Sequence, residues 1–337
     1  MNAIALCLGS TVIYWGSLVI TLGLLAALLM TLYLQRAVGG RSAPVLLFMI
    51  LLLLFSVPLC RALHWYCHIE QYESFRAAMT DYDSGSYVLS GALLGAWLAA
   101  LLAARIDRGC SGAALLDVFA PGAALAVAFI RLSALFNSSC RSKIVFRSET
   151  PALRHLPLAS GVPDTAGKLE YRFATFFVQF LLMLLICWLL LRFFSRRHAV
   201  PMRSGSREGN TARMFLLYYS ACELLMDSTR YDSSFMHFNG FVSMVQMISA
   251  VSILGVLVYY SIHWVRADGG RPTRCHRRWW IAWFLTLVMV GMSEYLVQRF
   301  GDWYVACYAG MALGCVLMVL VVRRVYRYCC AEEPQPE

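Results

Sequence analysis

The run PVLLFMILLLLFSVPLC at residues 44–60 decides the fold, because all seventeen positions lack a charge. An apolar helix of about 20 residues crosses the ~30 Å hydrocarbon core of a bilayer. Further apolar stretches of similar length begin near Tyr14, Val88, Ala113, Phe173, Met214, Phe241, Trp279 and Trp303. A bilayer offers no water to hydrogen-bond backbone groups, so we expect each stretch to be a helix. The sequence predicts an all-α, polytopic integral membrane protein with about nine transmembrane helices.

The composition of the whole chain excludes an ordinary soluble protein. Hydrophobic residues make up 60% of the 337 positions and charged residues only 14%, and the mean hydropathy is +0.62. Soluble domains carry about 25% charged residues. The net charge of +10 comes mainly from arginines that flank the apolar runs. Anionic lipid is therefore the expected counterpart of this charge, and nucleic acid is not.

The loops between the predicted spans differ in their content of lysine and arginine. Eighteen of the 29 basic residues lie in alternate connections, at 36–41, 105–108, 192–213, 266–278 and 323–327. Cytoplasmic loops keep the excess of positive charge. These segments fall on one side only if the number of spans is odd and the N-terminus lies outside. We therefore expect an external N-terminus and a cytoplasmic C-terminal tail.

The cysteines and histidines form no evident framework. No CxxC pair occurs among the twelve cysteines, and most of them lie in predicted spans or on the cytoplasmic side. Cys67 and Cys140 fall in predicted external loops, where an oxidising compartment would allow a disulfide. Cys60, His64 and His68 share one helical face and are compatible with zinc. We favour an interfacial aromatic belt over a metal site there, and we expect no metal or cofactor.

Ionisable residues inside the spans are the most informative positions, because each costs ~2.5 to 3.5 kcal/mol or more at the bilayer centre. They are Arg61, Arg131, Glu223, Asp227, Arg230 and Glu294. The sixth span carries one helical stripe at i, i+4, i+8 and i+11 spacing, formed by Tyr219, Glu223, Asp227 and Arg230. We expect this stripe, with Arg61 and Arg131, to line a polar cavity open to the outer leaflet. The competing interpretation is that these charges only staple helices together as ion pairs.

Several segments carry a resemblance to one family. They are YWGSLVITLG from Tyr14, CRALHWY from Cys60, LSGALLGAWLAALLAARIDRG from Leu89, LLDVFAPGAALAVAFIRLSALFN from Leu115, YSACELLMDSTRYD from Tyr219 and GFVSMVQMISAVSIL from Gly240. Over roughly residues 12 to 265 the chain resembles the prolipoprotein diacylglyceryl transferases. The resemblance implies a seven-span domain at 1–265, two additional C-terminal helices at 266–328, a tail at 329–337, and a bacterial inner membrane.

The resemblance also implies a reaction and a set of site residues. Family members move a diacylglyceryl group from phosphatidylglycerol onto the cysteine of a lipoprotein precursor. The catalytic positions carried over are Arg131, Asn137, Tyr219, Asp227 and Arg230. The positions expected to bind lipid are Trp15, Arg61, Glu223, Gly240 and Gln246. A phospholipid and a lipoprotein-precursor peptide are thus the expected partners.

The chain departs from the family pattern where the chemistry is most demanding. Ser90, Gly91 and Ala92 stand for a histidine-glycine-glycine triplet, and Ala134, Ser139 and Ser142 replace an asparagine, a glutamate and a glycine of the family signature. Glu223 replaces a second arginine. A phosphodiester leaving group develops negative charge that guanidinium groups stabilise, whereas Glu223 repels phosphate or pairs with Arg131.

These departures leave three functions open. The first is a transferase with an altered site, whose donor is phosphatidylglycerol or a zwitterionic lipid; in the latter case Glu223 would meet the ammonium and Arg131 the phosphate. The second is a non-catalytic relative that binds lipid or precursor, or acts as a membrane scaffold. A transporter is the third, although the two halves show no matching pair of Gly- or Pro-broken helices. We favour the transferase on family likeness.

Overall fold

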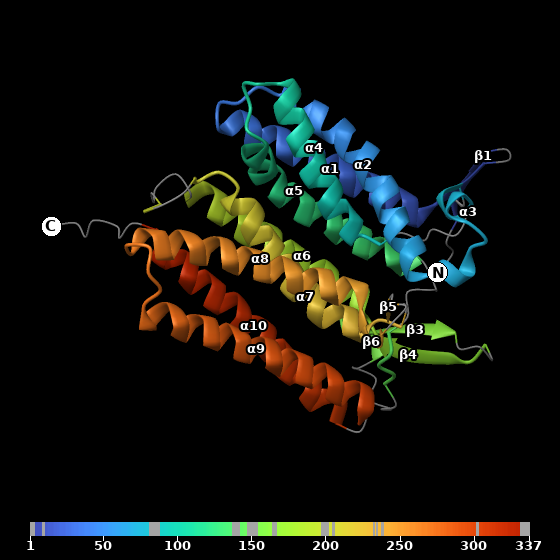
Figure 1. Cartoon of the computed structure of the whole chain (residues 1–337). Coiled ribbons are helices and arrows are strands. Elements are labelled where there is room, and N and C mark those ends of the chain that lie inside the picture. The colour runs from blue at the N-terminus through green and yellow to red at the C-terminus, as the bar shows by residue number, and fades with distance from the viewer. Residues whose placement is uncertain are drawn as a thin grey trace.

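The computed structural model describes residues 4–8, 11–80, 88–136, 142–146, 154–163, 167–196, 202–203, 206–231, 233, 235–236, 239–300 and 303–330. Within these residues, nine long helices stand where the apolar runs predict them. They are α1 (Trp15–Ala37), α2 (Ala43–Cys67), α4 (Ser90–Ile106), α5 (Gly112–Ser133), α6 (Thr175–Arg196), α7 (Asn210–Thr229), α8 (Met244–Ala267), α9 (Arg274–Arg299) and α10 (Tyr304–Cys329). The long helices run along one common direction (Figure 1). An all-α, polytopic membrane protein is confirmed.

Short elements cap one end of the bundle. They are the helical turns η1 (Ile69–Gln71), α3 (Phe75–Thr80) and η2 (Ala134–Phe136), and the strands β1 (Ile4–Leu8), β2 (Thr11–Tyr14), β3 (Ala159–Pro163), β4 (Leu169–Phe173), β5 (Phe235–Met236) and β6 (Asn239–Ser243). The strands pair antiparallel as β1–β2, β3–β4 and β5–β6. Figure 1 shows these hairpins at the end opposite to the C-terminal end of α10. The described arginine-rich connections lie at that other end.

Two of the nine helices differ from ordinary spans. Seven helices are long and apolar enough to cross a membrane, namely α1, α2, α5, α6, α8, α9 and α10. The exceptions are α4, which has 17 residues, and α7, which carries the charged stripe. Helix α7 packs against α5, α6, α8 and α10, and 15 of its 20 residues are buried. A polar helix is tolerated at membrane depth when protein surrounds it.

The hydrophobic core lies where α5, α6, α7, α8 and α10 meet. Met183, Leu217, Tyr260 and Met311 are fully buried there. Helices α2 and α4 form a second, closer contact. A Cβ atom on Gly91 would lie 2.5 Å from the backbone nitrogen of Cys60, so only glycine permits this approach. Small residues at helix interfaces are how membrane helices gain close packing.

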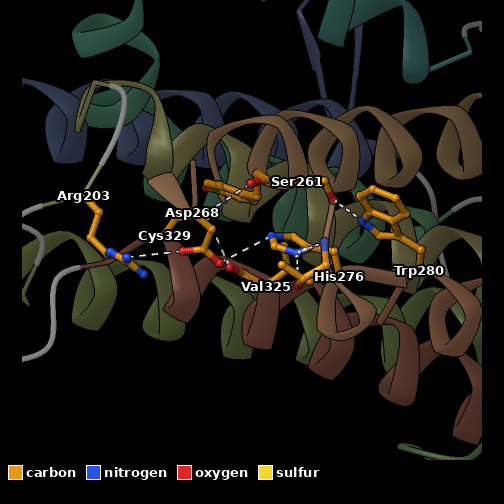
Figure 2. Close-up of polar contacts among 9 residues, drawn as sticks. Arg203, Ser261, Asp268, His276, Trp280, Val325 and Cys329 are labelled. Carbon is orange, nitrogen blue, oxygen red and sulfur yellow. Dashed lines mark hydrogen bonds and ion pairs between the residues drawn. The ribbon is translucent and has the colours of Figure 1, made fainter. Parts of the chain in front are cut away.

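The arginine-rich end is held by its own polar contacts. Arg41 pairs with Asp107 at 2.9 Å across two neighbouring loops. Asp268 lies between Arg203 (3.3 Å) and His276 (3.6 Å), as Figure 2 shows. The contacts of Asp268 tie the end of α8 and the start of α9 to the loop before α7. They position the helices. Which side of the membrane this end of the bundle faces is indicated only by the distribution of lysine and arginine among the loops.

Candidate functional site

The polar centre of the bundle is built on an ion pair between α5 and α7. Arg131, near the C-terminal end of α5, donates from Nη2 to Oε1 of Glu223 at 2.7 Å. The side chains are 13% and 1% exposed. Gln179 of α6 lies on the other side, with its Nε2 3.5 Å from Glu223 Oε2. Three helices therefore converge on one carboxylate, as the ion-pair interpretation predicts.

The ion pair does not use all the hydrogen-bonding capacity of Arg131. Its Nε is buried and has no acceptor among the residues that the structure describes. Buried donors in proteins nearly always have a partner. The contact between Gln179 and Glu223 is also longer than the usual 2.7–3.2 Å of an N–H···O bond. One donor of Arg131 thus has no partner among the described residues, and one oxygen of Glu223 has only the long contact to Gln179.

Asp227 lies one turn further along α7 and is tied to the start of α8. It accepts a hydrogen bond from the hydroxyl of Ser243, which also accepts from the backbone N–H of Gln246 at 3.0 Å. The side chain of Gln246 returns to the Ser243 N–H at 3.1 Å, completing a capping box. Asp227 therefore fixes α8 against α7. The lipid-binding role of Gln246 stays a prediction, since this amide is engaged in the cap.

The rest of the stripe completes the cluster. Tyr219 is buried and stacks on Phe215, with ring centroids 5.5 Å apart. Arg230, the residue that ends α7, lies close enough to interact electrostatically with both Arg131 and Asp227. The structure thus brings together five of the predicted residues, which we call the polar cluster: Arg131, Tyr219, Glu223, Asp227 and Arg230.

A loop after α5 closes the end of α7. Ser142 donates to the carbonyl of Thr229 at 2.8 Å and forms a β-bridge with Arg230. Arg172 of β4 donates to the Ser142 carbonyl at 2.9 Å. The hydroxyl of Ser142 satisfies a helix-terminal carbonyl. Charged residues within the spans were considered from the sequence, and Ser142, Arg172 and Gln179 were therefore not selected as site residues. Gln179 is uncharged, and the other two lie outside the spans.

The remaining predicted site residues have other contacts or fall outside the described residues. Arg61 is buried and donates from Nε to the carbonyl of Ala78 at 2.9 Å, which anchors α3 on α2. Trp15 stacks on Phe136 at 6.3 Å, close to the end of α5. Gly240 lies in β6. The predicted residue Asn137 and the variant position Ser139 lie outside the described residues.

At the histidine-rich end of α2 the aromatic rings pack against one another. The rings of His64 and His68 stack at 4.2 Å, and the hydroxyl of Tyr72 approaches His64 Nδ1 at 3.5 Å. Among the residues that the structure describes, no three His, Cys, Asp or Glu side chains are placed to hold a metal ion. Cys140 lies outside those residues, so its pairing with Cys67 stays a prediction.

Known proteins match the part of the chain that forms most of the helical bundle. The family described as prolipoprotein diacylglyceryl transferase matches residues 3–262. A phosphatidylglycerol–prolipoprotein diacylglyceryl transferase of Synechococcus elongatus is 28% identical over 225 residues, which cover 66% of this chain and 74% of the relative. The polar cluster lies inside the family match. Helices α9 and α10 lie beyond it.

Proposed function

Because this chain belongs to the prolipoprotein diacylglyceryl transferase family, we propose that it transfers a diacylglyceryl group from a phospholipid to the cysteine of a lipoprotein precursor. The observation that carries the proposal is the buried guanidinium of Arg131, whose Nε lacks an acceptor among the described residues. A phosphate oxygen is the acceptor that a buried arginine binds best. Arg230 adds a second cation nearby.

The reaction assigns a task to each part of the polar cluster. The acceptor thiol attacks the glyceryl carbon that carries the phosphate, a C–S bond forms, and the C–O bond to phosphate breaks. The headgroup phosphate leaves with the electron pair, and the thiol proton passes to a base. Arg131 and Arg230 stabilise the charge that develops on the phosphate. Asp227 and Ser243 are positioning residues, because they hold α8 against α7.

The charge of the polar cluster favours a zwitterionic donor. With both carboxylates ionised, Arg131 and Arg230 balance Glu223 and Asp227, so the four formal charges sum to zero. An anionic headgroup would leave this buried site with a net negative charge, whereas a zwitterionic headgroup keeps it neutral. The weakly held Glu223 oxygen, 3.5 Å from Gln179, suits an ammonium group. We therefore propose a phosphatidylethanolamine-type donor.

A second candidate is a non-catalytic relative that binds lipid or precursor without turnover. The observation that favours it is the 2.7 Å ion pair between Arg131 and Glu223. A ligand phosphate must compete with this pair. In addition, no histidine stands where the family has one, at Ser90, and histidine is the usual base near neutral pH.

Mass spectrometry of a prolipoprotein peptide separates the two candidates. The peptide is incubated with purified protein and with phosphatidylethanolamine and phosphatidylglycerol whose acyl chains differ in mass, so that the product identifies its donor. We expect a diacylglyceryl adduct mainly from phosphatidylethanolamine, and at least a ~100-fold loss in Arg131→Ala. The control Arg105→Ala removes an exposed arginine at the far end of α4 and keeps full activity.

Two outcomes contradict these assignments. Full activity in Arg131→Ala shows that this arginine does not bind the donor phosphate. No adduct from either lipid, under conditions in which the Synechococcus relative works, identifies the non-catalytic relative.

The membrane arrangement is part of the same proposal. We place the protein in a bacterial inner membrane with an external N-terminus and a cytoplasmic C-terminus. The division at residue 265 is supported by the family match, which ends at residue 262. The arginine-rich loops then face the cytoplasm, and the polar cluster lies in the half nearer the outer leaflet. A reporter that is active only outside the cytoplasm, fused after residue 337, should stay inactive; activity would reverse the topology.

A further inference from the structure

A groove of about 670 Å³ lies between α8 and α9, at the end of the bundle with the arginine-rich loops. The two helices follow each other in the chain, yet α8 packs mainly on α7 and α9 mainly on α10. Their facing sides are left to line the groove. Its walls are mostly apolar, with Leu257, Val258, Ile262, Trp283 and Phe284 among the lining residues.

The groove has the depth of one membrane leaflet. On α8 its lining runs from Leu254, near the middle of the helix, to Arg266, close to its end. At ~1.5 Å per helical residue, this stretch is ~18 Å long. One leaflet of the hydrocarbon core is ~15 Å thick. The apolar part of the groove therefore begins near the bilayer centre, and the arginine lies at the interface.

A polar contact fixes the two walls of the groove. Trp280 of α9 donates from its indole Nε1 to Oγ of Ser261 on α8 at 3.0 Å (Figure 2). One turn away, Trp283 is only 6% exposed, and its Nε1 has no acceptor within the described part of the chain. Two tryptophans of α9 thus line the groove, and one of them is hydrogen-bonded to the α8 wall.

The mouth of the groove carries positive charge that no ion pair among the described residues neutralises. Asp268 is the only carboxylate in the loop between α8 and α9. It is engaged by Arg203 at 3.3 Å and faces His276 at 3.6 Å (Figure 2). Among the described residues, no ion pair is found for Arg266 or for Arg271, which follows a lining residue in the loop.

We propose that this groove binds one anionic phospholipid of the leaflet on the arginine-rich side. One acyl chain lies between α8 and α9, and the phosphate binds Arg266. Charge complementarity selects the anionic headgroup, because each arginine near the surface contributes about fivefold to its binding. The groove lies at the other end of the bundle from the polar cluster. It therefore does not depend on the transferase reaction.

Native mass spectrometry tests the headgroup contact. The full chain is reconstituted in nanodiscs of equal parts phosphatidylglycerol and phosphatidylethanolamine, released, and scored for retained lipid. We expect one tightly held phosphatidylglycerol, and about fivefold less retention in Arg266→Gln. Arg278→Gln is the matched control, since it removes an exposed arginine of α9 that does not line the groove. Equal retention of phosphatidylglycerol in Arg266→Gln and Arg278→Gln overturns the proposal.

A second pair of variants tests the acyl-chain contact. Val258 and Val251 are exposed valines two turns apart on α8, and only Val258 lines the groove. We expect Val258→Trp to fill the groove and abolish lipid retention, while Val251→Trp keeps it. Retention in Val258→Trp equal to that in Val251→Trp overturns the proposal. Loss of a dimer peak in Val258→Trp, with the lipid adduct unchanged, identifies a second copy of the chain as the occupant and also overturns it.

Discussion

The two ends of α7 are held by buried carboxylates that are satisfied in different ways. At the arginine-rich end, Asp117 of α5 accepts from the backbone N–H groups of Gly209 (2.8 Å) and Ala212 (2.9 Å). Toward the other end, Glu223 depends on Arg131 and on a long contact to Gln179. Both carboxylates belong to residues that are 0% exposed. Burial alone therefore does not distinguish the two carboxylates.

The two carboxylates differ in the groups that hydrogen-bond to them. Backbone N–H groups at a helix N-terminus are fixed by the fold, and the helix dipole favours a negative charge there. No ligand can replace them without unfolding the turn. Side-chain partners such as Arg131 and Gln179 can rotate toward a bound headgroup. We infer that the Asp117 end supports the fold and that the Glu223 end holds the chemistry.

Removal of Asp117 should have the largest effect on stability. Asp117→Ala leaves the N–H groups of Gly209 and Ala212 buried without an acceptor, and this should lower the free energy of unfolding by about 3 kcal/mol. Unfolding in SDS measures the change. The control is Asp107→Ala, whose partner Arg41 is 72% exposed; it should cost less than ~1 kcal/mol. Equal losses in the two variants would contradict the role of Asp117.

Ser243 should come second, because it serves two groups at once. Ser243→Ala removes the cap of α8 and the donor to buried Asp227, at a cost of about 2 kcal/mol. The matched control is Thr273→Ala, which removes the equivalent cap of α9 and should cost ~1 kcal/mol. Differential scanning fluorimetry of both variants gives the difference. A larger loss in Thr273→Ala would show that the Asp227 bond contributes nothing.

Glu223 should control the choice of donor lipid more than stability. Glu223→Gln keeps the shape of the side chain and leaves Arg131 without its countercharge, so an anionic phosphate becomes its best partner. We expect the ratio of phosphatidylglycerol-derived to phosphatidylethanolamine-derived adduct to rise about tenfold, equivalent to ~1.4 kcal/mol. Glu294→Gln is the control, since this glutamate is also buried but lies on α9. An unchanged ratio in Glu223→Gln would remove Glu223 from headgroup selection.

Most of the fold could be predicted from the sequence, because a membrane span can be recognised from its own length and apolar composition. Apolar runs such as 44–60 need no knowledge of their neighbours to be recognised as helices. Helix α7 required a different argument, since its charges lower its hydropathy. Only the helices around it make the carboxylates at 223 and 227 tolerable. The spacing of its stripe indicated that it faces protein, and its burial confirms this.

The site was less predictable, because pairing depends on which helices are neighbours. The sequence could suggest that Arg131 and Glu223 meet, since both lie in spans and have opposite charge. It could not show that Asp117 caps α7. In that contact the carboxylate accepts a hydrogen bond from a backbone N–H group 92 positions away, and every residue but proline has such a group. Nor could the sequence reveal the α8–α9 groove, which exists because α9 packs on α10 instead of on α8.

The smallest expected effect concerns the link between the appended helices and the polar cluster. Tyr308 of α10 donates from its hydroxyl to the carbonyl of Ser228 at 3.3 Å, next to Asp227. Tyr308→Phe should lower the free energy of unfolding by ~0.5–1 kcal/mol, the net value of one neutral hydrogen bond. Tyr304→Phe, at the exposed start of the same helix, should change it by less than half of that.

The same two variants separate a structural link from a functional one. If α10 only braces the end of α7, Tyr308→Phe will lower stability and leave the donor ratio of the transfer reaction unchanged. A changed donor ratio at unchanged stability would instead mean that α10 sets the position of Asp227 and, through it, of the lipid headgroup. In that case the helices beyond the family match would be part of the machinery that selects the donor.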